Sequence, residues 1–514
     1  MVLIQQLRSH KNDTAKAQCI IDEEIAAHEA AIRRLKSRRN TYSTIARLPP
    51  ETLTAVFLSL KTAASQNEAA RVAWVCRQWR DVALASPRLW SFIDTARGEY
   101  ALELLARSKS APLRVTCLTT PSTERPEPIF EAIMKEVGHI QKLTICLPLS
   151  DILHFLRLNG AASAPMLQFL QVISTDEQPT TPLPPDILLR EMPSLLHLGL
   201  SDIEIRSDLP PFPHLTYLTI SVPSFPMTSS QLLHILRHSP KLERIVVYGV
   251  AANGFLDASI SPIQLPNLSQ IDILSYDLEV SAILANAEYP PSASVAFINQ
   301  TLHAGEPDLT SLAKICRHLH QGKGARPSIN NIELVGDIFG GFRLTVLDKN
   351  NVHLLSVRLE VERRYSPASS LVLCMALGLE TLSCLTLQSF EHQTETGWSS
   401  LLSHCTEVQD LRLTDVYTPL IKALMGSSSN EPPLPKLQTL RVHQSTFVTR
   451  RLDGDASFFV AFKEFLEKRK HLDIPVKAVK ISTSIITAEL VEELRGLTEI
   501  TWDGDEGFVV YDDE

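Results

Sequence analysis

The sequence of 514 residues predicts an α/β fold in two parts, a helical N-terminal region followed by an irregular solenoid with a parallel sheet. Apolar residues stand at helical spacing through much of the segment before residue 95. A motif of the form L-x-x-L-x-L, in which Ile or Val also occurs, then recurs thirteen times. We therefore expect three regions: a short coiled-coil-like helix in 1–44, an all-helical domain in 45–95, and a repeat domain in 96–514 with an acidic C-terminal tail.

Composition limits the classes of function. With 44% hydrophobic and 21% charged residues the chain can bury a sizeable core, and its net charge of −9 argues against a dedicated nucleic-acid binder. The N-terminal stretch turns polar after seven residues, and no run of apolar residues is long enough to span a membrane. Eight scattered cysteines without a C-x-x-C pair are typical of reduced thiols, so we expect a cytoplasmic or nuclear protein.

The first expected element is a helix from about Asp13 to Arg39. Its seam is formed by residues at alternating steps of four and three: Ile21, Ile25, His28, Ile32 and Leu35. Glu29 precedes Arg33 by four residues, the favourable order for a helical ion pair. Because the seam covers only about three heptads, packing against its own chain is the favoured interpretation, and pairing with a partner helix is the alternative.

Residues 45–94 predict two helices joined by a polar connector, KTAASQNE. Pro50 suits the first turn of a helix, and apolar residues on one face extend this helix from about Glu51 to Leu60. A second helix is expected to present one narrow apolar stripe, formed by Val72, Val75, Cys76, Trp79, Val82 and Ala83. Ser86-Pro87 ends it. A unit this small buries area efficiently with large rings, at about 25 cal/mol per Å², and usually leaves apolar surface for a partner.

These residues carry a resemblance. The stretches LPPETLTAVFLSL and VAWVCRQWRDVALASPRLW resemble the F-box, most closely the form common in mushroom-forming fungi. F-box domains dock on the Skp adaptor of cullin-RING ubiquitin ligases. The resemblance therefore implies that an adaptor-docking surface is built or supported by Leu48, Pro49, Leu53, Phe57, Val75, Trp79, Leu89 and Trp90. Trp74 lies opposite Trp79 on the expected helix, and packing against the upstream helix or the following domain is its favoured interpretation.

The thirteen motifs recur at the spacing of leucine-rich repeats, about 20 to 29 residues, in which each unit is a short strand with a returning helix or loop. They begin at residues 140, 167, 195, 215, 242, 268, 329, 354, 382, 408, 437, 476 and 497, with another expected strand near ASVAFIN. The asparagine that follows the strand in that family is absent, since its place falls on Ile203, Pro223, Val250 and Tyr276. We expect one continuous horseshoe-like sheet of irregular curvature.

The residue between the last two apolar positions of each motif must point to the opposite, concave side of the sheet. In the last six repeats four of these residues are basic: Arg358, Arg412, Arg441 and Lys480. One interpretation is a solvated face partly neutralised by Glu360 and Asp410. The other is a stripe, flanked by His443 and Ser482, that binds an acidic or phosphorylated segment of a target protein.

No pattern in the sequence predicts catalysis, a cofactor or a metal. His234 and His238 are four residues apart, but the glutamate of H-E-x-x-H is absent. The loop around Gly322 and Gly324 lacks P-loop spacing, and the acidic C-terminus does not match a calcium loop. We therefore expect no enzyme, but the target-recognition subunit of a Skp–cullin–F-box ubiquitin ligase; the alternative is an F-box and repeat scaffold that acts without the cullin.

Overall fold

The structure, a computed structural model, divides into two compact units: the first takes the residues up to Phe169 together with Met192, and the second takes the other described residues from Leu170 onward. It describes residues 14–60, 68–118, 127–158, 163–176, 192–204, 211–222, 226–252, 262–301, 306–321, 328–336, 341–362, 365–388, 393–426, 432–447 and 458–505. The loop at Gly322 to Gly324, most of the connector after Leu60 and all but the start of the acidic tail lie outside these residues. The fold class is confirmed: helices come first, and a mostly parallel sheet with helices follows.

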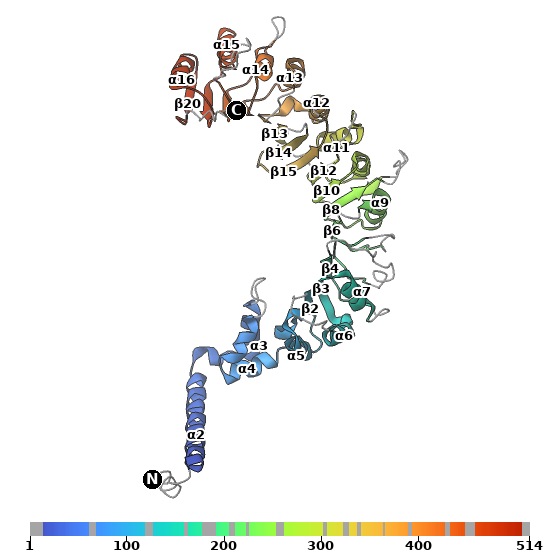
Figure 1. The fold of residues 1–514 in the computed structure, drawn as a ribbon, viewed down its shortest axis with the longest axis vertical. Helices are drawn as coiled ribbons and strands as arrows, with labels where there is room; N and C mark the ends of the chain where they lie inside the picture. Colours follow the sequence, from blue (N-terminus) through green and yellow to red (C-terminus); the bar gives the residue numbers. More distant parts are fainter. Residues whose placement is uncertain are drawn as a thin grey trace. The chain divides into compact units, whose positions relative to one another are not determined.

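The N-terminal part of the first unit is helical (Figure 1). Its elements are α2 (Thr14–Thr41), η1 (Thr44–Arg47), α3 (Pro50–Ser59), η2 (Glu68–Trp74), α4 (Arg77–Leu84) and η3 (Pro87–Trp90). The helix α2 has no buried residue, so the expected packing against its own chain is wrong. The expected single helix through Val72 and Ala83 is wrong as well, because Cys76 is extended and separates η2 from α4.

The remainder of the first unit alternates strands and helices. Its elements are β1 (Phe92–Asp94), η4 (Thr95–Arg97), α5 (Glu99–Ser108), β2 (Leu113–Leu118), α6 (Glu127–Lys135), η5 (Val137–His139), β3 (Ile140–Leu147) and α7 (Leu149–Arg157). Parallel pairing joins β1 to β2 and β2 to β3. Strand-and-helix alternation thus begins before the first sequence motif at residue 140. The motif search did not find β1 and β2, because neither strand carries the full L-x-x-L-x-L pattern.

The second unit continues this alternation. Its strands are β4 (Phe169–Ser174, across the boundary), β5 (His197–Ser201), β6 (Tyr217–Ser221), β7 (Met227–Thr228), β8 (Arg244–Ala251), β9 (Ile263–Gln264), β10 (Gln270–Ser275), β11 (Ala287–Glu288), β12 (Ser294–Asn299), β13 (Ile329–Gly336), β14 (Phe342–Asp348), β15 (His353–Leu359), β16 (Cys384–Gln388), β17 (Asp410–Thr414), β18 (Thr439–His443), β19 (Ala478–Ser482) and β20 (Glu499–Trp502). Its α-helices are α9 (Ser229–His238), α10 (Ser281–Ala285), α11 (Thr310–Gln321), α12 (Ser366–Ala376), α13 (Glu395–Leu402), α14 (Thr418–Met425), α15 (Phe458–His471) and α16 (Ala488–Arg495).

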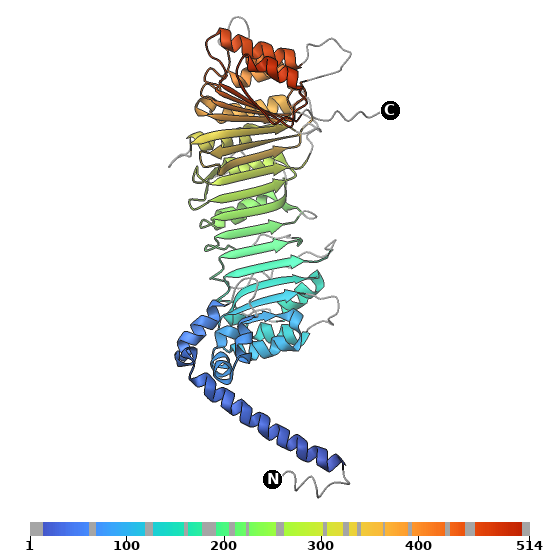
Figure 2. The ribbon, with the colours of Figure 1, turned by 90° about the vertical axis from the view of Figure 1, so that its left-hand side faces the viewer.

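A strand lies in every one of the thirteen motifs, and the expected strand near ASVAFIN is β12. Within the second unit the strands lie side by side (Figure 2), and the motifs at 195, 215, 242 and 268 share one parallel sheet. The motif leucines point inward, as Leu215, Leu218 and Ile220 do at 0% exposure. The strands of this unit line its concave side and the helices its convex side (Figure 1), which is the geometry that L-x-x-L-x-L predicts.

One part of the order in the sheet differs from the expectation. The motifs at 329 and 354 were expected to be consecutive parallel repeats, but their strands, β13 and β15, flank an antiparallel strand, β14. The spatial order is therefore β12, β15, β14, β13, β16, since β15 pairs with β12 and β13 pairs with β16. The turn between β14 and β15 is stabilised by the Asp348 carboxylate, which accepts hydrogen bonds from the backbone N–H groups of Asn350 and Val352 at 2.7 and 2.8 Å.

Serine hydroxyls occupy the place of the missing asparagines in the last repeats. Ser445 and Ser484 stand at the same motif position as Ile203 does in an earlier repeat, and both are buried. The Ser445 hydroxyl accepts from the N–H of Val416 at 3.4 Å, and the Ser484 hydroxyl accepts from the N–H of Ser445 at 3.2 Å. A side-chain ladder therefore links neighbouring turns, with hydroxyls in place of amides.

Arg469 on α15 is buried, with 1% of its surface exposed, and is held by carbonyl oxygens. It donates to Ile474 at 3.2 Å, to Pro433 at 3.1 Å and to Leu434 at 3.0 Å. Leu434 has a φ of 54°, an unusual conformation for a residue with a side chain. Burial lowers the pKa of Arg469 to about 10, so the guanidinium remains charged at neutral pH and stabilises this turn.

Replacement of this side chain tests that role. Arg469→Ala is expected to lower the free energy of unfolding by about 2–4 kcal/mol, because three carbonyl oxygens lose their donor. The exposed Glu464 of the same helix offers a control, and Glu464→Ala should change stability by less than about 0.5 kcal/mol. Denaturant unfolding of both variants measures the difference, and equal midpoints would contradict the assigned role.

Candidate protein-binding surfaces

Two surfaces are candidates for binding other proteins, one in each unit. In the first unit, Phe57 of α3 and Trp79 of α4 contact each other with ring centroids 5.0 Å apart. The Trp90 ring is buried, its Nε1 donates to the carbonyl oxygen of Ala83 at 2.8 Å, and the Arg107 guanidinium lies 4.8 Å from the ring centroid. These contacts form a small core that holds α3, α4 and η3 together.

The eight residues predicted for adaptor docking fall into three groups in the structure. Leu53, Phe57, Leu89 and Trp90 are buried in this core. Leu48 and Trp79 are half-buried, whereas Pro49 and Val75 are exposed. The buried four support the surface, and the other four are accessible to a partner.

Besides Val75, further accessible apolar side chains lie outside the predicted docking set. Trp74 is 77% exposed, which contradicts the expectation that it packs on the upstream helix or the following domain. Val75, the next residue, is 61% exposed. Val56 of α3, Leu60 directly after α3 and Leu84 of α4 are exposed as well. For Trp74 the available signal was its position opposite the predicted apolar stripe, since large exposed apolar side chains are typical of protein-binding sites.

The 3-10 helix η1, which precedes α3, is anchored by polar contacts. Gln78 of α4 donates from Nε2 to the carbonyl oxygen of Ala46 at 2.9 Å, which holds the segment before Leu48 and Pro49 against α4. The Thr54 and Ser86 hydroxyls lie 2.9 Å apart and join α3 to the start of η3. The exposed Pro49 and the half-buried Leu48 therefore lie on a backbone that is held in place on both sides.

A cleft of about 380 Å³ lies between the C-terminal part of α2 and the start of α4. Its basic lining residues are Arg33, Lys36, Arg39 and Arg77. Arg33 is paired with Glu29 at 3.1 Å, so part of this charge is neutralised within α2. The cleft adds positive charge next to the exposed Val75.

In the second unit, three of the four basic residues predicted for target binding form one row on the concave face. The pairing registers place Arg412 beside Arg441 and Arg441 beside Lys480 on consecutive strands. The Asp410 carboxylate accepts from Nε of Arg412 and from Nε of Arg441, both at 3.1 Å. Both guanidinium side chains remain more than 40% exposed, at 43% and 46%. We call Arg412, Arg441 and Lys480 the basic row.

Arg358 does not belong to the basic row. It lies on β15, which three strands separate from β17. Across these strands the residue of β15 that aligns with Arg412 is Ser356, two residues before Arg358. Arg358 is paired with Glu360 at 2.9 Å. Arg343 of β14 lies directly opposite it, a basic residue that the sequence did not predict because β14 was not recognised as a strand.

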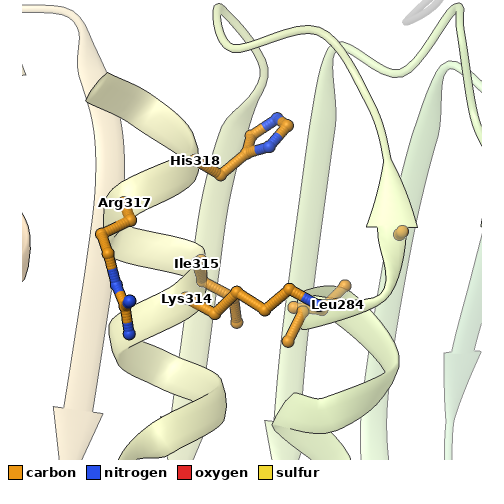
Figure 3. Close-up of a pocket in the computed structure, with 7 residues that line it drawn as sticks. Leu284, Lys314, Ile315, Arg317 and His318 are labelled. Carbon is orange, nitrogen blue, oxygen red and sulfur yellow. The ribbon is translucent and has the colours of Figure 1, made fainter. Parts of the chain in front are cut away.

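A depression in the second unit does not bring its polar side chains together at one point. A depression of about 230 Å³ between α10 and α11 is lined by Leu284, Ala285, Ala287, Lys314, Ile315, Arg317 and His318. Lys314 extends toward Leu284 and Arg317 points to the other side of α11 (Figure 3). Lys314 donates to Asn286 at 2.9 Å, and His318 contacts the carbonyl oxygen of Tyr289 at 2.9 Å. These polar groups are engaged by the chain itself rather than directed at a common point.

Within the described part of the chain, no group of three or more His, Cys, Asp or Glu side chains could hold a metal ion. His234 and His238 contact each other, with ring centroids 4.3 Å apart. Burial raises the pKa of Cys384, which adjoins the basic row, to about 11, so it is a neutral thiol at pH 7. Among the described helices, none has the length and hydropathy needed to cross a membrane.

Comparison with known proteins locates one domain. Residues 45–96 match the family model described as F-box-like. A search of curated proteins found no match. Among solved structures, the crystal structure of a Bacteroides fragilis protein aligns over 84% of both chains with 11% identity and a TM-score of 0.16.

Because some of these residues are buried and others exposed, we expect substitutions to differ strongly in their effect on the free energy of unfolding. Phe57→Ala should lower the free energy of unfolding of the first unit by about 3–5 kcal/mol, because it leaves a cavity against Trp79. Trp74→Ser and Val75→Ser should change it by less than about 0.5 kcal/mol, because both side chains are already exposed. Thermal unfolding measures both, and a large loss from Trp74→Ser would show that this ring is buried.

Proposed function

We propose that this chain is the target-recognition subunit of a Skp–cullin–F-box ubiquitin ligase, on the premise that residues 45–96 form an F-box-like domain. In this proposal the F-box docks on the Skp adaptor, and the repeat unit binds the target. The observation that carries it is the coincidence of the family match with an apolar surface that the chain leaves uncovered.

The docking surface is proposed to consist of the accessible members of the predicted set. Pro49 and Val75 are exposed, Leu48 and Trp79 are half-buried, and Trp79 contacts Phe57 of the core. Burial of such side chains by a partner releases about 25 cal/mol for each Å² of apolar surface. Leu53, Phe57, Leu89 and Trp90 contribute by holding the surface in shape.

The target site is proposed to be the basic row. Asp410 binds the Nε atoms of Arg412 and Arg441 and so orients both side chains. Both side chains keep more than 40% of their surface exposed, and a guanidinium can bind a carboxylate or phosphate in bidentate fashion. Lys480 is exposed and adds a third positive charge. An acidic or phosphorylated segment of the target matches this arrangement.

The mechanism requires no catalytic residue on this chain. A ligase subunit that holds a target near a charged conjugating enzyme raises the effective concentration of the target's lysines. The rate gain then depends on how long the target stays bound, which is set by the contacts of the repeat unit.

Co-expression with the adaptor and cullin tests the docking half. Leu48→Ala combined with Pro49→Ala should abolish adaptor capture in a pull-down, because it removes the apolar contact but leaves the core intact. Glu99→Ala on the exposed start of α5 is a control that should bind normally. Unchanged capture by the folded double variant would disprove the assigned surface, and capture of adaptor without cullin would favour the scaffold function.

Charge reversal tests the target half. Arg412→Glu combined with Arg441→Glu should abolish capture of the target while adaptor binding persists, because the row then repels an acidic segment. Lys463→Glu with Lys470→Glu on the convex helix α15 makes the same change in charge away from the row. Proteins cross-linked to the wild type with the ligase inhibited can be compared across the variants by mass spectrometry. A target retained by the row variant would rule this site out.

A further inference from the structure

We infer that α2 is a self-association helix, through which two copies of this chain pair in antiparallel orientation. The helix is 28 residues long and has no buried residue. Its seam residues Ile21, Ile25, Ile32 and Leu35 are 41%, 51%, 50% and 67% exposed. A helix of this length with an uncovered apolar seam gains stability chiefly by packing on another surface.

The heptad positions follow from the seam. Ile25 and Ile32 take the a positions, and Ile21, His28 and Leu35 take the d positions. The charged residues that flank the seam are then Asp22, Glu29 and Lys36 at e, and Glu24 and Arg38 at g. These flanking residues determine the orientation of a helix pair.

The charges are divided along the helix. Asp22, Glu24 and Glu29 are in its N-terminal two-thirds, whereas Lys36 and Arg38 are near its C-terminal end. A parallel pair would place each Glu24 against the partner's Glu29, and these like charges repel. Parallel pairing is therefore disfavoured by the same residues that flank the seam.

An antiparallel pair brings opposite charges together. With Ile25 opposite the partner's Leu35, Glu24 faces the partner's Arg38 and Asp22 faces the partner's Lys36. The twofold arrangement forms each of these attractive contacts twice, and its one repulsive contact joins the two copies of Glu29. Charge complementarity thus selects a second copy of this chain, in antiparallel orientation, as the occupant of the seam.

The contacts that α2 makes within itself do not compete strongly. His28 lies 3.6 Å from Glu24, and Arg33 lies 3.1 Å from Glu29. Both are exposed pairs on one helix, and such pairs contribute little to stability in water. Glu24 keeps 47% of its side chain exposed and is available to a partner.

Sedimentation velocity of the full-length chain over a range of concentrations tests the inference. The wild type should change from monomer to dimer as its concentration rises. Glu24→Lys should weaken the dimer by about tenfold or more, because two attractive contacts become repulsive. Adding Arg38→Glu to the same chain should restore wild-type association, because the pair is then exchanged.

Glu23→Lys is the matched control, since Glu23 lies on the face opposite the seam and carries the same charge. It should associate as the wild type does. Three results would each overturn the inference: a wild type that is monomeric at every concentration, a Glu24→Lys variant that associates more tightly, as a parallel pair predicts, or equal weakening by Glu23→Lys and Glu24→Lys.

Discussion

The repeat units of this protein depend on the in-register pairing of short parallel strands. A strand such as β17 buries its motif residues Val408, Leu411 and Leu413 only because a neighbour lies on each side and a helix covers the face. The same register determines what stands on the opposite face. Arg412 and Arg441 are neighbours because their strands pair residue for residue, so the basic row is a consequence of core packing.

Most of the strands could be predicted from the sequence, because apolar residues at a fixed spacing indicate which side chains are buried. The strands of all thirteen motifs were found in this way. The antiparallel β14 was missed, although FRLTVLDKNNVHLLSVRL has two apolar runs around a polar turn, a hairpin pattern. A motif search aligns each repeat with the next and has no means of detecting a reversal, so Arg358 was assigned to a row it does not join.

In the F-box-like domain the sequence identified the residues but not their accessibility. Helical spacing placed Val75 and Trp79 on one stripe, whereas the extended Cys76 interrupts the helix and turns Val75 outward. A local break of this kind depends on packing between α3, η2 and α4, which spacing within one segment does not encode. Asp410 is a similar case. Its position two residues before Arg412 is plain in the sequence, but its second contact, with Arg441, requires the pairing of two distant strands.

The reversed order of β13, β14 and β15 also affects how the second unit can fold during synthesis. In a regular array each newly synthesised strand pairs with the preceding one, so the repeats can fold one after another during synthesis. Here the edge of β12 has no partner until β15 emerges, beginning at His353, because β13 and β14 occupy positions farther along the sheet. The nascent chain must therefore hold an open strand edge while three strands assemble, and such an edge is prone to pair wrongly. The reversal divides the array into a block that ends at β12 and a block that begins with β13. We expect the docking of these two blocks to be the slow step of folding.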